Sequence, residues 1–181
     1  LLRFCLEKLK KLLTFFIMKK IILASILFIA SLKAFCGVVD HDRMYQAYLS
    51  NDMSVWKTEL QKYTASTDLT ITDKLEISNY LYGYIATLLT DADKNKQEII
   101  GWIELWEKYL EEIEKTTGKN AYIHVYRSSI NAYKSKVKAG GMMVWGPRSL
   151  TELKRALNID PNNPLANGLK GNMLFYMPGF V

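Results

Sequence analysis

Few side chains in this sequence have both the type and the spacing that catalysis or metal binding requires. His41 stands between Asp40 and Asp42, a trio that could loosely hold a metal ion. It lies close to Gly37, where we expect the mature chain to begin, so we interpret it as part of a solvated, mobile tail. His124 has no histidine or carboxylate at i+4, whereas zinc needs three or four suitable ligands. We predict no metal site and a partly buried, structural His124.

Serine and glutamate side chains offer two further kinds of chemistry. Ser128-Ser129 could supply a nucleophile, but a catalytic serine needs a base and a strained, exposed setting. Glycoside cleavage needs two carboxylates that face one substrate across a cleft. We expect small serines at a close helix contact, no cofactor and no enzymatic activity. The glutamates should instead spread over a solvated helix face, and they are Glu104, Glu107, Glu111, Glu112 and Glu114.

These residues lie on segments with the periodicity of α-helices. Apolar residues recur at steps of three and four, and short polar breaks separate one segment from the next. The clearest amphipathic segment runs from Ile99 to Ile113 and stops at Gly118. Other predicted helices cover about 42–49, 53–63 and 70–89, and three more begin after Asn120, at Ser149 and at Pro164.

Aromatic side chains give the chain its greatest binding potential. Most of the 11 tyrosines and four tryptophans are at helical spacing and are first of all packing residues. Some could line the concave face of a helical array, where amphipathic rings suit a peptide or a sugar. The segment from Gly140 to Pro147 either seals the array or forms a small binding lip. The candidate binding residues are Tyr80, Tyr84, Trp102, Trp106, Tyr126 and Trp145.

The N-terminal residues have the order of an export signal. Two lysines after Met18, an uncharged stretch from Ile21 to Leu32 and small residues near Cys36 are typical of a secretory signal peptide. We interpret 1–17 as an upstream extension, 18–36 as the signal peptide and 37–181 as one domain. The apolar stretch is shorter than the roughly 20 residues of a spanning helix. We expect no stable membrane span after cleavage, with a retained anchor as the alternative.

The leader also holds the charge excess and both cysteines. The chain has a net charge of +6, and the whole excess lies in residues 1–36. The remaining domain is formally neutral, which argues against nucleic acid as a partner. With Cys5 and Cys36 removed, disulfides and cysteine catalysis are excluded. A lipidated Cys36 is the alternative, but Lys33 and Phe35 stand where a lipoprotein signal has a leucine-like and a small residue.

The C-terminal third contains a compact corner between two helices. One helix ends in Ala156-Leu157, Asp160-Pro161 forms a turn, and Asn163 caps the next helix with Pro164 at its first position. This corner resembles the junction between tetratricopeptide repeats (TPRs). Gly171 falls where that repeat has a glycine that lets two helices approach closely. The resemblance covers residues 156–171, and no clean 34-residue repeat precedes it.

The resemblance implies an all-α, TPR-like array of antiparallel helical hairpins, with about seven helices after the signal peptide. It looks like exported bacterial TPR-like proteins in which a further helix follows, so we expect Leu174, Phe175 and Phe180 to be exposed. It implies a noncatalytic helical-repeat protein of the periplasm or cell envelope that binds a protein or peptide. The alternatives are an envelope protein that binds a small ligand or sugar and, less favoured, a hydrolase.

Overall fold

Side chains at the segment ends determine where the helices start and stop. Asp52 accepts hydrogen bonds from the N–H groups of Ser54 and Val55, and Thr70 forms a capping box with Asp73. Asn120 caps the following helix, and Gly118 ends the one before it with a φ of 74°. These predicted boundaries are confirmed.

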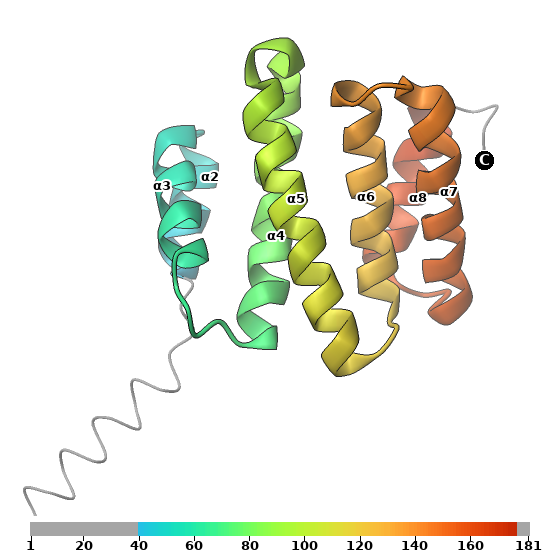
Figure 1. The fold of residues 1–181 in the computed structure, drawn as a ribbon, viewed down its shortest axis with the longest axis horizontal. Coiled ribbons are helices and arrows are strands. Elements are labelled where there is room, and N and C mark those ends of the chain that lie inside the picture. Colours follow the sequence, from blue (N-terminus) through green and yellow to red (C-terminus); the bar gives the residue numbers. More distant parts are fainter. Residues whose placement is uncertain (1–39, 177–181) are drawn as a thin grey trace, which may run out of the picture. The chain divides into compact units, whose positions relative to one another are not determined.

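The computed structural model describes residues 40–176 (Figure 1). Regular structure in this part of the chain is entirely helical. The predicted signal peptide and Phe180 lie outside the described residues. The elements are α2 (His41–Leu49), α3 (Met53–Thr64), α4 (Ile71–Leu88), η1 (Leu89–Asp91), α5 (Ala92–Thr117), α6 (Ala121–Val137), α7 (Gly141–Ile159) and α8 (Pro164–Tyr176).

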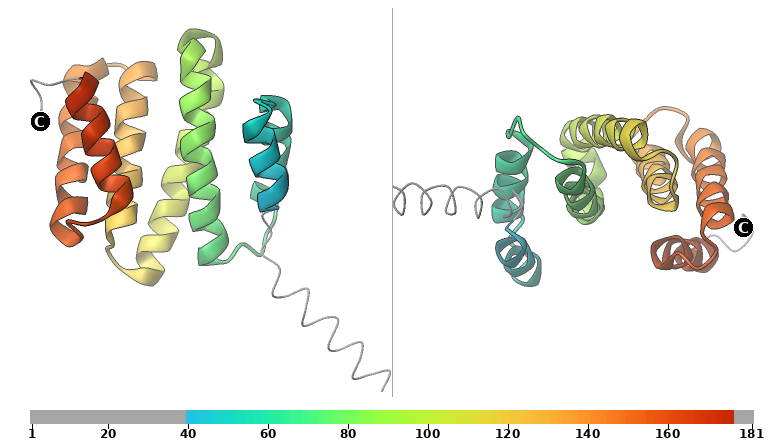
Figure 2. Two further views of the ribbon diagram at one scale, coloured as in Figure 1. Left: turned by 180° about the vertical axis from the view of Figure 1, so that it is seen from behind. Right: turned by 90° about the horizontal axis from the view of Figure 1, so that it is seen from below.

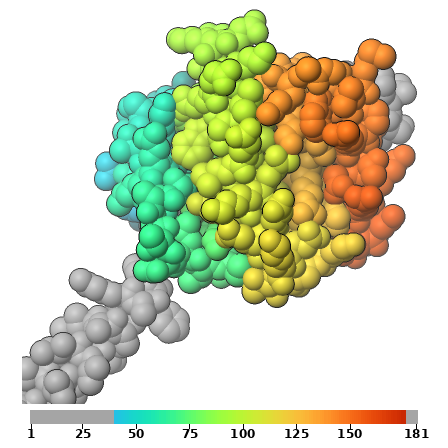
Figure 3. Space-filling view, in the orientation of Figure 1, coloured from blue at the N-terminus to red at the C-terminus, as the bar shows by residue number. Residues whose placement is uncertain are grey.

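Consecutive helices pack side by side and antiparallel. In addition, α6 contacts both α4 and α8, so alternate helices are also neighbours. Figure 1 shows α3, α5 and α7 in front of α2, α4 and α8, and the end-on view of Figure 2 shows the same two layers. Side chains fill the gaps between the ribbons on the face where α3 and α5 lie in front (Figure 3). The all-α, antiparallel fold is therefore as predicted.

The amphipathic stripe of α5 forms the centre of the core. Trp106, Ile103 and Leu110 are fully buried, and the whole predicted row from Ile99 to Ile113 faces inward. Burial of each such side chain contributes roughly 1.5–3 kcal/mol. A smaller cluster joins α6, α7 and α8, and its buried members are Val125, Leu153, Ala156, Ala166 and Met173.

The segment after Gly140 differs from its prediction. Gly140 and Gly141 have positive φ values of 85° and 48° and break the chain after α6, but α7 begins at Gly141 rather than at Ser149. Trp145 helps hold this first part of α7, because its Nε1–H donates to the carbonyl of Ala139 at 3.0 Å. The segment is thus helical and not a loop. Ser149 is buried inside α7 and does not cap it.

The predicted close approach at Gly171 is wrong. A side chain at this position would meet no heavy atom within 4 Å, and Gly171 is exposed. The reason is helical periodicity, since Ala166 and Met173 are seven residues apart on the buried face and Gly171 lies elsewhere. Leu174 and Phe175 are 43% and 79% exposed, in line with the expectation for those two residues.

Candidate functional site

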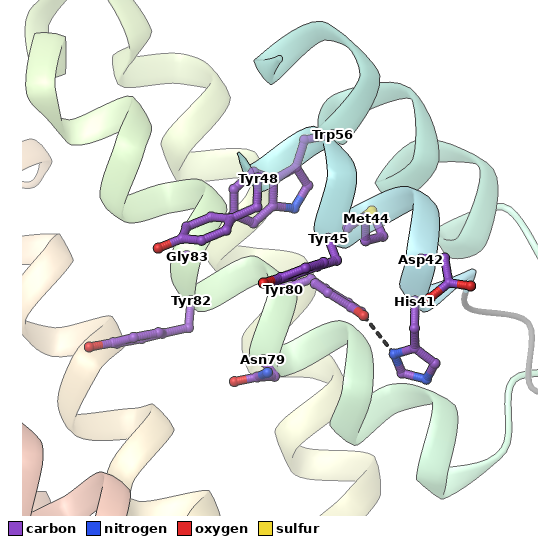
Figure 4. A pocket seen from close by; sticks show the side chains of 10 residues that line it. All are labelled: His41, Asp42, Met44, Tyr45, Tyr48, Trp56, Asn79, Tyr80, Tyr82 and Gly83. Carbon is purple, nitrogen blue, oxygen red and sulfur yellow. Dashed lines mark hydrogen bonds between the residues drawn. The ribbon is translucent and has the colours of Figure 1, made fainter. Parts of the chain in front are cut away.

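A groove lined with tyrosines runs over α2, α4 and α6. It consists of two adjoining hollows with volumes of about 460 and 300 Å³, which share His41, Asn79 and Tyr80. Figure 4 shows the first hollow, where side chains of α2 and α4 point toward one another. We call the whole surface the tyrosine groove, and its tyrosines are Tyr45, Tyr48, Tyr80, Tyr82, Tyr122 and Tyr126.

Helical spacing brings the groove residues together. On α2, Met44 and Ala47 face the core, which leaves Tyr45 and Tyr48 on the open side. On α4, Glu76, Asn79, Tyr80 and Gly83 follow the i, i+3, i+4, i+7 pattern of one helix face. Each helix therefore contributes one row of side chains to the groove.

Gly83 permits α3 to approach α4 closely at the floor of the groove. A Cβ atom at this position would lie 3.0 Å from the ring of Trp56, which is tighter than an ordinary contact. Trp56 is buried against Gly83 and meets the ring of Tyr48 edge to face at 5.9 Å. The glycine thus sets the depth at which the Trp56 ring lies below Tyr48.

Polar contacts connect three side chains where the two hollows of the groove adjoin. The Tyr80 hydroxyl and His41 Nδ1 are 2.7 Å apart, and His41 Nε2 lies 3.3 Å from the carboxylate of Glu76. Burial and the nearby charge of Glu76 raise the pKa of Tyr80, so its hydroxyl is neutral at physiological pH. The expected mobile tail at His41 is wrong, because Asp40 caps α2 and accepts from the N–H of Arg43.

The rim of the groove exposes aromatic surface beside negative charge. Tyr45, Tyr48 and Tyr122 are 58%, 62% and 46% exposed. Tyr122 lies near the start of α6 and is not among the buried residues of that helix. Asp42 and Glu76 line the hollows, whereas no lysine or arginine of the described chain does. The surface therefore offers rings, hydroxyls and carboxylates.

Most of the aromatic residues singled out from the sequence are packing residues. Trp106 is fully buried, and Tyr84, Trp102 and Tyr126 are nearly so. Burial raises the pKa of Tyr126 to about 12. Tyr80 lines the groove. Trp145 lies on α7, where the charged groups of Lys134 and Arg148 are 4.9 and 4.7 Å from its ring centroid. The packing interpretation is confirmed for the four buried rings.

Glu98 connects two of these rings to α3. The Tyr84 hydroxyl and Trp102 Nε1 both donate to Glu98 Oε1, at 2.8 and 3.2 Å, and Lys57 Nζ lies 2.9 Å from Oε2. Burial favours the neutral acid, but these hydrogen bonds outweigh it and lower the pKa of Glu98. A charged carboxylate therefore joins α3, α4 and α5.

The serines and glutamates lie in structural contacts. Ser128 Oγ donates to the carbonyl of Ser149, and Ser149 Oγ donates to that of Ser128, both at 2.8 Å. This exchange confirms a close helix contact. Several glutamates of α5 pair with cations on neighbouring helices rather than with a second carboxylate, as in Glu107–Lys134, Glu112–Lys74 and Glu114–Arg127 at 2.5, 2.8 and 2.7 Å.

His124 has a partner that the sequence did not indicate. The histidine is buried on α6, and its Nδ1 lies 2.6 Å from Glu152 Oε2 on α7. In residues 40–176 no three metal-ligating side chains come together. The same range contains no helix with the length and hydropathy that a membrane crossing demands.

The groove brings aromatic rings, hydroxyls, an amide and carboxylates to one open surface. Its side chains come from α2, α3, α4 and α6, and the two hollows adjoin at His41, Asn79 and Tyr80. No protein-family model, no curated protein and no solved structure matches the chain.

Proposed function

We propose that this chain is a noncatalytic, exported, TPR-like protein that binds an extended peptide segment of another protein in the cell envelope. The observation that carries the proposal is the tyrosine groove. Its exposed rings, Tyr45 and Tyr48 on α2 and Tyr122 on α6, border hollows that share Tyr80 of α4. The alternating contacts of the helices support a stacked array, whereas the exposed Gly171 does not support a regular repeat.

The chemistry of the groove suits a peptide. A tyrosine supplies a large apolar ring with little conformational freedom to lose, and its hydroxyl can bond a peptide carbonyl or N–H. Asn79 is exposed within the groove and adds an amide that can pair with a main chain. Two joined, open hollows accommodate an elongated partner better than a compact one.

A sugar or other small ligand is the second candidate. The larger hollow has about 460 Å³, which falls within the size range of small-molecule pockets. It places Asp42 and Asn79 beside aromatic rings, a combination that can bond hydroxyls while a ring covers the apolar face of a sugar. Direct titration with short oligosaccharides distinguishes this candidate from a peptide.

Capture from an envelope fraction tests the proposed function. The full-length chain serves as bait beside the double variant Tyr45→Ser/Tyr48→Ser, in which both changed residues are exposed. Met143→Ser is the matched control, because Met143 is 92% exposed on α7 and lies outside the groove. We expect one envelope protein to bind the wild type and the control but not the double variant. Equal capture by all three baits contradicts the groove assignment.

Export is tested separately from binding. A tagged protein that starts at Met18 should be shortened near Gly37 and recovered outside the cytoplasm, because residues 18–36 have the order of a cleavable signal. Immunoblots of cell fractions measure both size and location. An uncleaved product in the cytoplasm contradicts export and leaves the groove assignment open to its own test.

A further inference from the structure

A third hollow, which shares no lining residue with the tyrosine groove, is rich in cationic side chains. It has a volume of about 430 Å³ and lies where α5 ends, α6 begins and α7 ends. These three helix ends meet at the lower edge of Figure 1. We call it the basic hollow, and its polar lining residues are Glu114, Lys119, His124, Arg127, Arg155 and Asn158.

A partly buried carboxylate, that of Glu152, orients the histidine of the basic hollow. Both oxygens of Glu152 are engaged, Oε2 with His124 Nδ1 and Oε1 with an N–H of Arg155, each at 2.6 Å. His124 is only 5% exposed, and its Nε2 has no hydrogen-bond partner among residues 40–176. Because Nδ1 is held by Glu152, Nε2 is the nitrogen that a bound molecule can use.

Hydrogen-bond donors outnumber acceptors around the hollow. Arg127 donates to Glu114 at 2.7 Å, and this hydrogen bond lowers the pKa of Glu114 and keeps it charged. Each arginine uses part of its five-donor fork in these pairs and retains further N–H groups. Lys119 forms no ion pair within the described range, although it lines the same space. The lining therefore contains three positive charges and one carboxylate, that of Glu114. Glu152 contacts His124 but does not line the hollow.

We propose that the basic hollow binds a small organic molecule through a carboxylate or phosphate group. Arg155 and Lys119 bind the oxyanion, and His124 presents Nε2 to the bound molecule. Arginine suits this role, since its planar fork matches two oxygens of one anionic group. The volume of about 430 Å³ exceeds that of a bare phosphate and leaves room for an attached organic portion.

The two histidines of the chain provide a direct readout. Inorganic phosphate and citrate are titrated separately into the full-length chain at constant ionic strength, with glycerol as a neutral control, while the histidine ring signals are recorded by NMR. We expect saturable shifts of His124, and His41 serves as an internal reference because it lies in the tyrosine groove. Binding by one anion alone identifies its group as the one recognised. If neither anion shifts His124 saturably, the proposal is wrong.

Two charge-removing variants locate the binding. Lys119→Gln and Arg155→Gln should each raise the dissociation constant about tenfold, because each removes one charge-assisted contact. Calorimetry measures this constant. Lys154→Gln is the matched control, as Lys154 is exposed beside Arg155 but does not line the hollow. Circular dichroism checks that each variant is folded. If Arg155→Gln unfolds, Lys119→Gln alone tests the proposal, because Lys119 is exposed and lies between α5 and α6. Equal affinity of wild type and Lys119→Gln overturns the proposal.

Discussion

Replacement of Trp106 by alanine removes the largest of the fully buried side chains at the centre of the core. Its ring is 0% exposed and packs against Tyr126 and Tyr133, with ring centroids 5.4 and 6.4 Å away. Truncation of a buried tryptophan commonly costs about 3–5 kcal/mol, because apolar contacts are lost and a cavity remains. A domain of this size has about 5–15 kcal/mol of stability in total. We therefore expect the Trp106→Ala variant to fold but to be much less stable than the wild type.

Urea unfolding, followed by circular dichroism, measures this cost. Trp106→Phe is the companion variant, because Trp106 Nε1 has no hydrogen-bond partner within residues 40–176 and phenylalanine removes that buried polar group. Trp106→Phe should reduce the free energy of unfolding clearly less than Trp106→Ala does. In thermal unfolding, Trp106→Ala should lower Tm by about 10–15 °C. A loss below about 1 kcal/mol for Trp106→Ala would refute the assignment of Trp106 to the core.

Two further predictions concern Gly83 and Glu98. Gly83→Ala should destabilise by about 1 kcal/mol through its contact with Trp56, whereas the control Gly101→Ala should stabilise slightly, because no atom lies within 4 Å of its Cβ position; equal effects in urea unfolding would contradict this. The lowered pKa of Glu98 means that its stabilisation is present above pH 4.5, its ordinary pKa, and is lost as pH falls through the lowered value. The Glu98→Gln variant should therefore be less stable than the wild type at neutral pH, and its free energy of unfolding should fall less on acidification. If both proteins lose the same stability in acid, the charged state of Glu98 is contradicted.

Local signals explain which parts of the fold could be predicted. A cap such as Asp52, or the box of Thr70 and Asp73, acts within three residues, so the sequence contains everything that the helix boundary needs. The predicted helix start at Ser149 is wrong, since Ser149 lies inside α7 and its Oγ–H donates to the carbonyl of Ser128 on α6. The contact between Ser149 and Ser128 spans 21 residues, so no local pattern reveals it.

The tyrosine groove could be predicted only in part. Tyr80 stood among the candidates, but Tyr45 and Tyr48 did not, because exposed aromatics on a short amphipathic helix give no sign of what lies opposite them. Their i, i+3 spacing was the available signal. His41 gained its role from Tyr80, 39 residues later in the chain. Likewise, the pairing of His124 with Glu152 depends on the packing of α7 on α6.

Site-specific photo-crosslinking tests most directly whether the tyrosine groove binds a peptide. A photoreactive phenylalanine derivative replaces Tyr48 at the exposed rim or Met143 on α7, and mass spectrometry after irradiation in cells identifies the attached peptide. We predict that position 48 attaches to one defined segment of another envelope protein and that position 143 does not. No adduct at position 48, or the same adducts at both positions, would contradict peptide binding in the tyrosine groove.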